Sequence, residues 1–309
     1  MSARFSNLQL FLVCVLIWGS TWLVITFQLG SVAPELSVAY RFLLAGAALI
    51  AFCRWRGHAL AFSVRQHLDL IAFGAAMFCL SYIFVYHAEL YIISGMVAVA
   101  YSASPMINMW ASRLFFGTPV TARVSVAASL GIVGIVCVFW GEFSKLSASR
   151  NLELGVFFTV ASVLASSAGS MVAMRTQRRG YATWPSMAWG MLYGGALALM
   201  YALVAGKPLR FEWTVPYVSS LLYLAILGSI VTFACYLTLL KRMGAAQSSY
   251  VGVMVPVVAL LVSVFFEGFQ WTWLTSVGVL LSLGGNVLML RGGQSSPSAN
   301  KASETSTAH

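Results

Sequence analysis

The residues of this sequence that could hold a small solute are aromatic rings and hydroxyl or amide groups inside long apolar runs. A cavity walled by rings, with a few hydroxyls, suits an amphipathic solute that has an apolar side chain. The candidates for lining such a cavity are Trp18, Thr21, Tyr82, Tyr86, Tyr101, Asn108, Ser166 and Tyr250. Tyr82 and Tyr86 are one helical turn apart, which places both on one face of a helix.

These candidates also have structural interpretations. Ser166 and Ser170 are four residues apart, a spacing typical of close helix packing in membranes. Tyr82 and Tyr86 lie near the outer end of their span, where aromatic residues often anchor a helix at the membrane interface. Trp18 lies deeper than such an anchor requires, so it packs against lipid, against the core or against the solute. The sequence leaves these alternatives open.

Two prolines and one arginine complete the candidate site. Pro105 and Pro256 fall inside apolar runs, where a proline kinks a helix and frees a backbone carbonyl. Those carbonyls either border a cavity or merely mark a bend. Arg41 lies roughly 10 Å along its span at 1.5 Å per residue and is a candidate for binding a substrate carboxylate. Its alternative is an anchoring role, by reaching the headgroups or by pairing with Glu35 or Glu89.

The elements that carry these residues follow from composition. Of the 309 residues, 60% are apolar and 8% are charged, whereas a soluble domain carries roughly 25% charge. Long continuous apolar runs predict membrane-spanning helices of about 20 residues, not the alternating segments of a β-barrel. The net charge of +10 comes from basic residues scattered between the runs, so we expect no nucleic-acid partner. The predicted fold class is an all-α polytopic protein of the lipid bilayer.

Ten transmembrane helices are predicted from apolar runs bounded by charges, Gly and Pro. They are 8–28, 34–53, 68–87, 94–116, 122–140, 152–174, 184–205, 215–240, 246–266 and 272–290. Of the 18 Lys and Arg, 13 fall on one side of this arrangement, which predicts that both termini are cytoplasmic. The remaining 292–309 is small and polar, which predicts a disordered tail.

An internal repeat divides the chain. A shift of 151 residues superposes identical residues, among them Pro105 on Pro256 and Gly134 on Gly285. Five spans per copy make the second copy enter the membrane from the opposite side. The predicted units are a first five-helix repeat, 1–146, and a second, inverted one, 147–291. Inverted repeats around a midplane site are a device for alternating access, so transport is the leading function class.

The sequence lacks the motifs of common pumps and enzymes. No G-x-x-x-x-G-K-[ST] loop occurs, so we expect no ATP as partner, and no H-E-x-x-H or G-x-S-x-G motif occurs. The five cysteines show no C-x-x-C spacing, so we expect no metal and no cofactor. An intramembrane enzyme would need a convergent nucleophile, metal cluster or acid pair, and a sensor would need a soluble signalling domain. We therefore expect a protein that is not an enzyme.

Acidic residues are scarce, and none lies near the middle of a predicted span. Proton-driven transporters and exporters of organic cations usually keep such a carboxylate for the coupling ion or the cargo. This absence argues against carboxylate coupling and makes facilitated diffusion the simplest mechanism. His87 or backbone carbonyls are the alternative ligands for a coupling ion.

Four segments resemble the EamA-type drug/metabolite transporters. They are Trp18-Gly19-Ser20-Thr21-Trp22, Arg41-Phe42-Leu43-Leu44-Ala45-Gly46, Lys241-Arg242-Met243-Gly244-Ala245-Ala246 running to Pro256, and Phe265-Phe266-Glu267-Gly268. The pattern, over about 8–290, is most similar to the YddG-type aromatic amino-acid exporters of that superfamily. Two positions depart from it: Thr26 stands where many relatives carry Lys, and Phe116 stands where the second copy has Glu267.

The resemblance implies a ten-helix exporter of the bacterial inner membrane with a central cavity. It favours the anchoring role for Arg41, because relatives with different cargo share this residue. Together, residues and resemblance predict a secondary transporter that exports amino acids, aromatic ones (Phe, Trp, Tyr) and other neutral ones such as Thr. The alternative keeps the fold and changes the cargo to another small metabolite or a drug. The sequence leaves the exact cargo, the coupling ion and the oligomeric state open.

Overall fold

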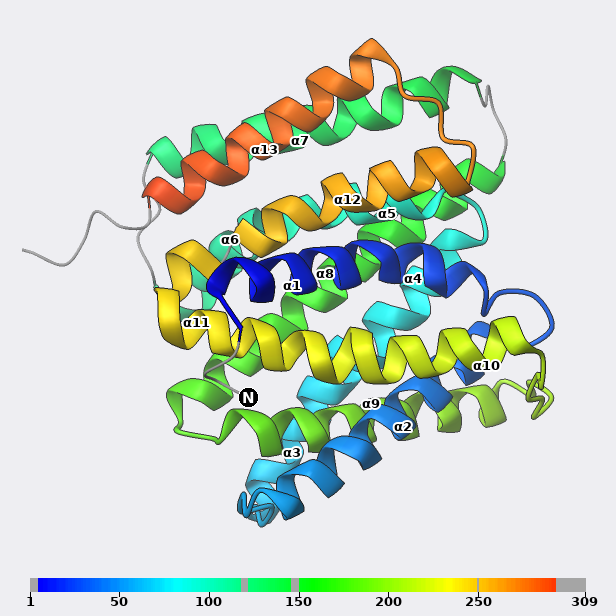
Figure 1. Cartoon of the computed structure of the whole chain (residues 1–309), viewed down its shortest axis with the longest axis vertical. Helices are drawn as coiled ribbons and strands as arrows, with labels where there is room; N and C mark the ends of the chain where they lie inside the picture. Colours follow the sequence, from blue (N-terminus) through cyan, green and yellow to red (C-terminus); the bar gives the residue numbers. More distant parts are fainter. Residues whose placement is uncertain (1–4, 118–121, 146–149, 249, 293–309) are drawn as a thin grey trace, which may run out of the picture.

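The computed structural model describes residues 5–117, 122–145, 150–248 and 250–292, and every regular element in those ranges is helical. The elements are α1 (Asn7–Thr26), α2 (Pro34–Trp55), α3 (Val64–Gly74), η1 (Ala75–Leu80), α4 (Ser81–Glu89), α5 (Ser94–Ala100), η2 (Tyr101–Ala103), α6 (Ser104–Phe116), α7 (Ala122–Lys145), α8 (Arg150–Arg178), α9 (Thr183–Val204), α10 (Val215–Leu222), η3 (Tyr223–Val231), α11 (Thr232–Ser248), α12 (Tyr250–Phe266) and α13 (Trp273–Gly292). Figure 1 shows them stacked side by side, with the start of α1 and the end of α13 at the same end of the molecule. The predicted tail falls, apart from Gly292, outside the described residues.

Six helices in the described ranges are long and apolar enough to cross a membrane, as a polytopic membrane protein requires. Three shorter apolar helices accompany them, over Ser125–Trp140, Tyr250–Phe266 and Trp273–Leu288. A helix pairs its own backbone N–H and C=O groups, which is necessary in the bilayer core because no water is available there to bond them. Side chains finish the exposed ends: Ser6 and Ser63 cap α1 and α3 in reciprocal bonds with Gln9 and Gln66.

The boundaries differ from the predicted spans mainly around α11. The sequence predicts that one span ends at 240 and the next begins at Ala246, whereas α11 continues to Ser248 and α12 begins at Tyr250. Ala245, Ala246 and Gln247 are strong helix formers, so α11 extends beyond its apolar part. Hydropathy alone does not detect such an extension.

Two of the long helices contain a π-helical segment. The helix over Val64–Glu89 passes through η1, and the helix over Val215–Leu240 passes through η3. In η3 the Ser229 hydroxyl donates to the carbonyl of Leu224, five residues earlier, at 2.9 Å. π-Helical turns are rare and occur frequently at functional sites.

The two prolines act differently. Pro105 is the second residue of α6 and follows the 3-10 turn η2, which separates α5 from α6. Pro256 lies inside α12, where it removes one donor from the helical hydrogen-bond ladder. The shared sequence position therefore corresponds to a helix start in one half and to a helix interior in the other.

Helices α2 and α9 pack closely along their length (Figure 1). A Cβ atom on Gly46 would lie 2.8 Å from the backbone nitrogen of Leu192. A Cβ atom on Gly195 would lie 2.8 Å from the backbone nitrogen of Leu43. Small residues at such contacts let two membrane helices approach.

Helices α7 and α13 form a second close pair (Figure 1). A Cβ atom on Gly134 would lie 2.5 Å from the carbonyl oxygen of Gly278. A Cβ atom on Gly285 would lie 2.5 Å from the carbonyl oxygen of Ala127. Neither backbone contact leaves room for a side chain.

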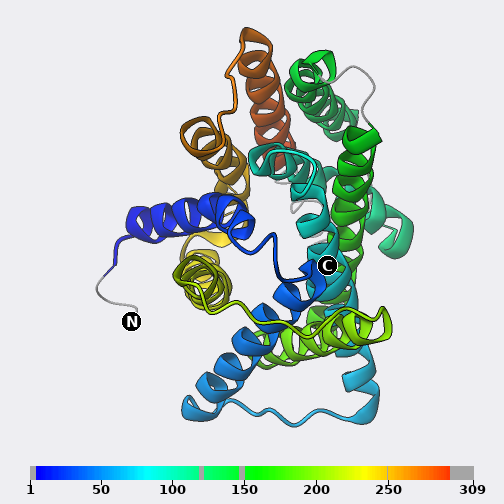
Figure 2. The ribbon, with the colours of Figure 1, turned by 90° about the vertical axis from the view of Figure 1, so that its right-hand side faces the viewer.

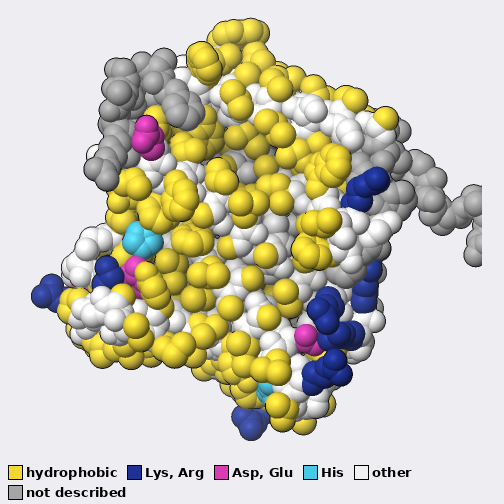
Figure 3. Space-filling model, turned by 180° about the vertical axis from the view of Figure 1, so that it is seen from behind, with side chains coloured by type: hydrophobic (Ala, Val, Ile, Leu, Met, Phe, Trp, Pro, Cys, Tyr) yellow, Lys and Arg dark blue, Asp and Glu magenta, His cyan; other side chains and the backbone are white. Residues whose placement is uncertain are grey.

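The outer surface suits a bilayer. Figure 3 shows hydrophobic side chains over the middle of one face, with Lys and Arg gathered mainly toward one edge. Large apolar residues such as Leu16, Leu164 and Leu280 are more than half exposed. Lipid, not water, is the medium in which this surface is stable.

Candidate functional site

A cavity of about 330 Å³ lies among the helices. Its walls come from α1, α2, α4, α5, α6, α8, α11 and α12, together with η1 and η2. In Figure 2, α1, α11 and α12 lie on one side of the molecule and α8 lies on the other. Small-molecule sites typically have volumes of roughly 300–1,000 Å³, so the cavity has room for a small solute.

Aromatic rings form much of the wall. Trp22 and Tyr101 pack edge to face with ring centroids 5.0 Å apart. Trp18 packs edge to face with Phe233 at 5.2 Å, and its indole N–H donates to the carbonyl of Gly228 at 3.0 Å. These contacts hold the rings in place, and the rings give the cavity wall an apolar surface.

Arg41 supplies the positive charge of the cavity. Its side chain is only 2% exposed, and its guanidinium lies over the Tyr82 ring at 4.6 Å and near the Phe42 ring at 5.1 Å. The Nε and Nη1 atoms are buried without a hydrogen-bond partner. Tyr86 is a hydrogen-bond partner of the guanidinium, so part of the group is satisfied. Since buried donors without partners are costly, the open Nε and Nη1 atoms are arranged to receive an anionic group.

The two partners that sequence reasoning suggests for Arg41 do not bind it. Glu35 pairs with His87 instead, with 2.9 Å between Glu35 Oε1 and His87 Nε2. Both carboxylate oxygens of Glu89 are without a hydrogen-bond partner. Burial also does not fit a side chain that reaches outward to headgroups. The anchoring interpretation, which the sequence favours, therefore does not describe this geometry.

One buried hydroxyl of the cavity wall has no hydrogen-bond partner among the described residues. The Ser104 Oγ is buried without a hydrogen bond, whereas Thr21 donates to the Trp18 carbonyl at 2.7 Å and Ser81 shares a hydrogen bond with Tyr101 at 3.0 Å. An unpaired buried hydroxyl costs free energy unless a ligand or water completes it. Ser104 is therefore a second polar contact for a ligand.

A backbone acceptor lies on the opposite wall. Pro256 has no N–H, so the carbonyl of Gly252, four residues earlier, loses its helical donor. Gly252 and Pro256 both line the cavity. The carbonyl of Gly252 is thus available to a donor such as an ammonium group.

The structure brings most of the predicted site residues together. Those that line the cavity are Trp18, Thr21, Arg41, Tyr82, Tyr101, Pro105, Ser166 and Pro256. Three others do not line it. Tyr86 is fully buried and donates to Gln28 Oε1 at 2.6 Å, Asn108 lies in α6, and Tyr250 is the first residue of α12.

Several wall residues are missed by the sequence-based selection. They are Trp22, Ile25, Met77, Ser81, Val85, Ala98, Ser104, Phe233, Gly252 and Val255. Ser104 adjoins Pro105, and Gly252 precedes Pro256 by one helical turn. Closeness to a proline inside an apolar run is therefore a sequence signal that points to both residues. Phe233 follows η3, and only the tertiary fold brings it to Trp18.

Comparison with known proteins identifies relatives over nearly the whole chain. The EamA-like transporter family matches two stretches, residues 6–140 and 153–291. An uncharacterized inner membrane transporter, YedA, of Escherichia coli K12 is 29% identical over 266 residues, which cover 82% of this chain and 80% of YedA. PecM of Dickeya dadantii is 26% identical, covering 86% of each chain, and PagO of Salmonella typhimurium is 21% identical, covering 84% of each.

A solved crystal structure has a similar fold. It covers 95% of this chain and 100% of its own, with a TM-score of 0.67 and 18% sequence identity. At this identity the likeness concerns the arrangement of the helices alone.

Proposed function

Because the chain belongs to the EamA-like transporter family, we propose that it is a secondary transporter that exports amino acids without ATP. The family and the inner-membrane relatives indicate a multi-pass transporter of the bacterial inner membrane, not an enzyme. The proposed cargo is aromatic amino acids (Phe, Trp, Tyr) and other neutral ones such as Thr. The cavity around Arg41 is the proposed binding site.

The observation that carries the cargo proposal is the buried Arg41 guanidinium in an aromatic cavity. A guanidinium with open N–H groups binds a carboxylate in a bidentate geometry. The rings of Trp22 and Tyr101 provide an apolar surface for a side chain. Every amino acid presents a carboxylate, and an aromatic one also presents a ring.

The ammonium group of an amino acid also finds partners. The carbonyl of Gly252 and the hydroxyl of Ser104 are acceptors on the cavity wall, and the faces of Trp18 and Trp22 attract cations. No Asp or Glu is among the residues that line this cavity in the described ranges. A lipophilic cation without a carboxylate would be repelled by the positive charge of Arg41 and would find no acidic side chain on the wall. We therefore expect such drugs to bind more weakly than amino acids.

The proposed architecture is ten transmembrane helices in two inverted repeats, 1–146 and 147–291. The family matches the two halves separately. The glycine contacts of the α2/α9 pair are reciprocal at equal distances, as are those of the α7/α13 pair. A pseudo-two-fold axis between equivalent helices would produce such reciprocity, and it supports this proposal.

Alternating access is the proposed mechanism. Two inverted repeats exchange conformations around a fixed midplane site, which opens first to one side and then to the other. The proposed flexible points are the segments η1 and η3, the turn η2 before Pro105, and Pro256 inside α12, because irregular hydrogen bonding eases bending. Both termini are proposed to be cytoplasmic.

A competition assay tests the cargo. Purified protein in liposomes would exchange labelled phenylalanine for unlabelled compounds from the opposite side. We expect phenylalanine, tryptophan and tyrosine to compete strongly, 3-phenylpropionate to compete weakly, and phenethylamine, which has no carboxylate, to fail. Equal competition by phenethylamine would contradict the role of Arg41.

The alternative cargo is another small metabolite or a drug on the same fold. The same assay separates the two, because a panel of structurally unrelated metabolites would then compete better than any amino acid. That outcome would support the proposed transport function but would replace amino acids with another substrate.

A further inference from the structure

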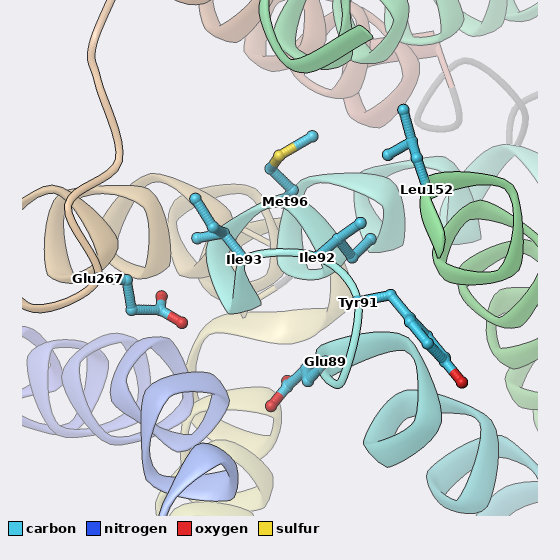
Figure 4. Close-up of a pocket in the computed structure, with 7 residues that line it drawn as sticks. All are labelled: Glu89, Tyr91, Ile92, Ile93, Met96, Leu152 and Glu267. Atoms are coloured by element: carbon cyan, nitrogen blue, oxygen red, sulfur yellow. The ribbon is translucent and has the colours of Figure 1, made fainter. Parts of the chain in front are cut away.

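A second pocket, of about 400 Å³, lies at the ends of α4 and α12, and two acidic residues line it (Figure 4). Glu89 is the last residue of α4, and Glu267 directly follows α12. Figure 4 shows their carboxyl groups facing the same gap from different helices, while the Tyr91 ring points away. The rest of the wall is apolar: Ile92, Ile93, Met96 and Leu152.

The two acids have opposite surroundings. Glu267 accepts hydrogen bonds from the Ser94 backbone N–H at 3.2 Å, from the Ser94 hydroxyl at 2.6 Å and from the Ser263 hydroxyl. Glu89 is 8% exposed, and neither of its oxygens has a hydrogen-bond partner. Donors stabilise an ionised carboxylate, whereas a buried carboxylate without donors is unstable unless it binds a cation. Glu267 therefore already has hydrogen-bond donors on both oxygens, whereas Glu89 is suited to take up a cation.

We propose that Glu89 is a proton-binding site, and that its protonation and the binding of a substrate carboxylate at Arg41 favour each other. In the step, a proton from hydronium in the bulk solution passes through water in the pocket to a Glu89 oxygen; the hydronium becomes water and the carboxylate becomes a neutral carboxylic acid. The second half of the proposal rests on the proposed function; the proton site itself does not.

Four groups on the surrounding elements act on Glu89. They are Arg41 from α2, Glu267 from the end of α12, Tyr101 from η2, and Tyr86 one turn earlier in α4. An ionised Glu89 repels Glu267 and offsets the charge of Arg41. Once protonated, Glu89 no longer offsets that charge, so Arg41 attracts the substrate carboxylate more strongly.

A proton fits this site better than a metal ion. Hard cations such as Ca²⁺ and Mg²⁺ take about six or more oxygen ligands, whereas both Glu267 oxygens already accept hydrogen bonds. The pocket walls add apolar side chains. The pocket has room for several waters, which provide a path for a proton to Glu89.

The proton site is tested first without any substrate. Infrared spectra of the purified protein would be titrated from about pH 8 to about pH 5, across the range above the ordinary carboxyl value. We expect the carbonyl band of a protonated carboxylic acid to appear in the wild type, to be lost in Glu89→Gln, and to persist in Glu267→Gln. The matched control is Glu153→Gln, because Glu153 is an exposed acid of α8.

Two results would overturn the proton site. One is a wild-type protein without a titrating buried-acid band at any pH, a measurement that needs no variant to fold. The other is a band that added Na⁺ removes at constant pH, because the site would then take a metal cation.

The coupling is tested with labelled phenylalanine. Allosteric couplings are typically 5–150-fold, and we expect wild-type affinity to rise by such a factor as the pH falls through the titration of Glu89. Glu89→Gln, which mimics the protonated acid, should bind tightly at every pH. A pH dependence retained in Glu89→Gln would overturn the coupling. If the infrared band titrates but no amino acid binds, the proposed function fails and the proton site remains.

Discussion

A buried arginine that forms no ion pair in the described part of the chain constrains this protein more than any other residue. The Arg41 guanidinium lies against the rings of Tyr82 and Phe42, with two of its nitrogens unpartnered. Burying such a group lowers the stability of the fold, and a bound anionic ligand would offset this by accepting its free hydrogen bonds. Residues of this kind mark the sites of membrane proteins where polar chemistry occurs.

Replacing Arg41 tests the carboxylate contact. A hydrogen bond to a charged group contributes about 1.5–3 kcal/mol, so Arg41→Gln should raise the KM for phenylalanine about tenfold or more. Arg65→Gln, at an exposed arginine of α3, is the matched control. The measurement is uptake into liposomes at equal amounts of folded protein. An unchanged KM in Arg41→Gln would remove the residue from the binding site.

Tyr82 tests the ring beneath the guanidinium. A cation–π contact contributes about 0.5–2 kcal/mol, so Tyr82→Ala should lower phenylalanine flux several-fold, while Tyr82→Phe should keep most of it. Tyr201→Ala provides the control, because the Tyr201 side chain is 53% exposed on α9. Equal flux in Tyr82→Ala and Tyr82→Phe would mean that the ring does not position Arg41.

Sequence spacing predicted the residues of the cavity only in part. Tyr82 and Tyr86 share a face of α4, but Tyr82 lines the cavity and Tyr86 is buried against Gln28. Periodicity indicates the direction of a side chain and not its depth among neighbouring helices. Glu89 was missed for the same reason, since the end of a span suggests an interface and only the tertiary fold buries it.

At the scale of elements, helices approach each other most closely at glycines, because glycine has no side chain. The apolar runs and their bounding charges predicted most helices, because length and hydropathy are local properties. Helix partners are not local: many glycines in the chain have free space around them, including Gly131 and Gly252. The sequence therefore could not single out Gly134 as the contact to Gly278.

A pair of substitutions in α7 tests this packing. Gly134→Ala would place a Cβ 2.5 Å from the carbonyl oxygen of Gly278 and 2.6 Å from the backbone nitrogen of Ser282, so it should lower the melting temperature. Gly131→Ala meets nothing within 4 Å and should be neutral or stabilising by up to about 1 kcal/mol, as Ala favours a helix. The readout is thermal unfolding in detergent. Equal melting temperatures would contradict the contact.

At the scale of the whole molecule, charge reports orientation. Lys and Arg gather mainly toward one edge of the face in Figure 3, and 13 of the 18 in the sequence fall on the predicted inner side. Cytoplasmic loops carry this excess in bacterial membrane proteins. Together with the ten helices that the sequence predicts, the asymmetry predicts that both ends of the chain lie inside.

Reporter fusions test the orientation. Green fluorescent protein, which fluoresces only in the cytoplasm, should be bright when fused after residue 309. Alkaline phosphatase, which is active only outside, should be active when fused within the loop between α9 and α10, at Lys207. A dark fluorescent fusion together with an inactive phosphatase fusion would reverse the topology.

The proposal that this chain carries amino acids through the Arg41 cavity is tested most directly by flux in a purified system. Liposomes that contain only the protein and unlabelled phenylalanine would be diluted into labelled phenylalanine, without ATP. The proposal predicts that label accumulates transiently inside, and that Arg41→Gln abolishes or strongly reduces this accumulation. No protein-dependent accumulation of phenylalanine, tryptophan or threonine would contradict it.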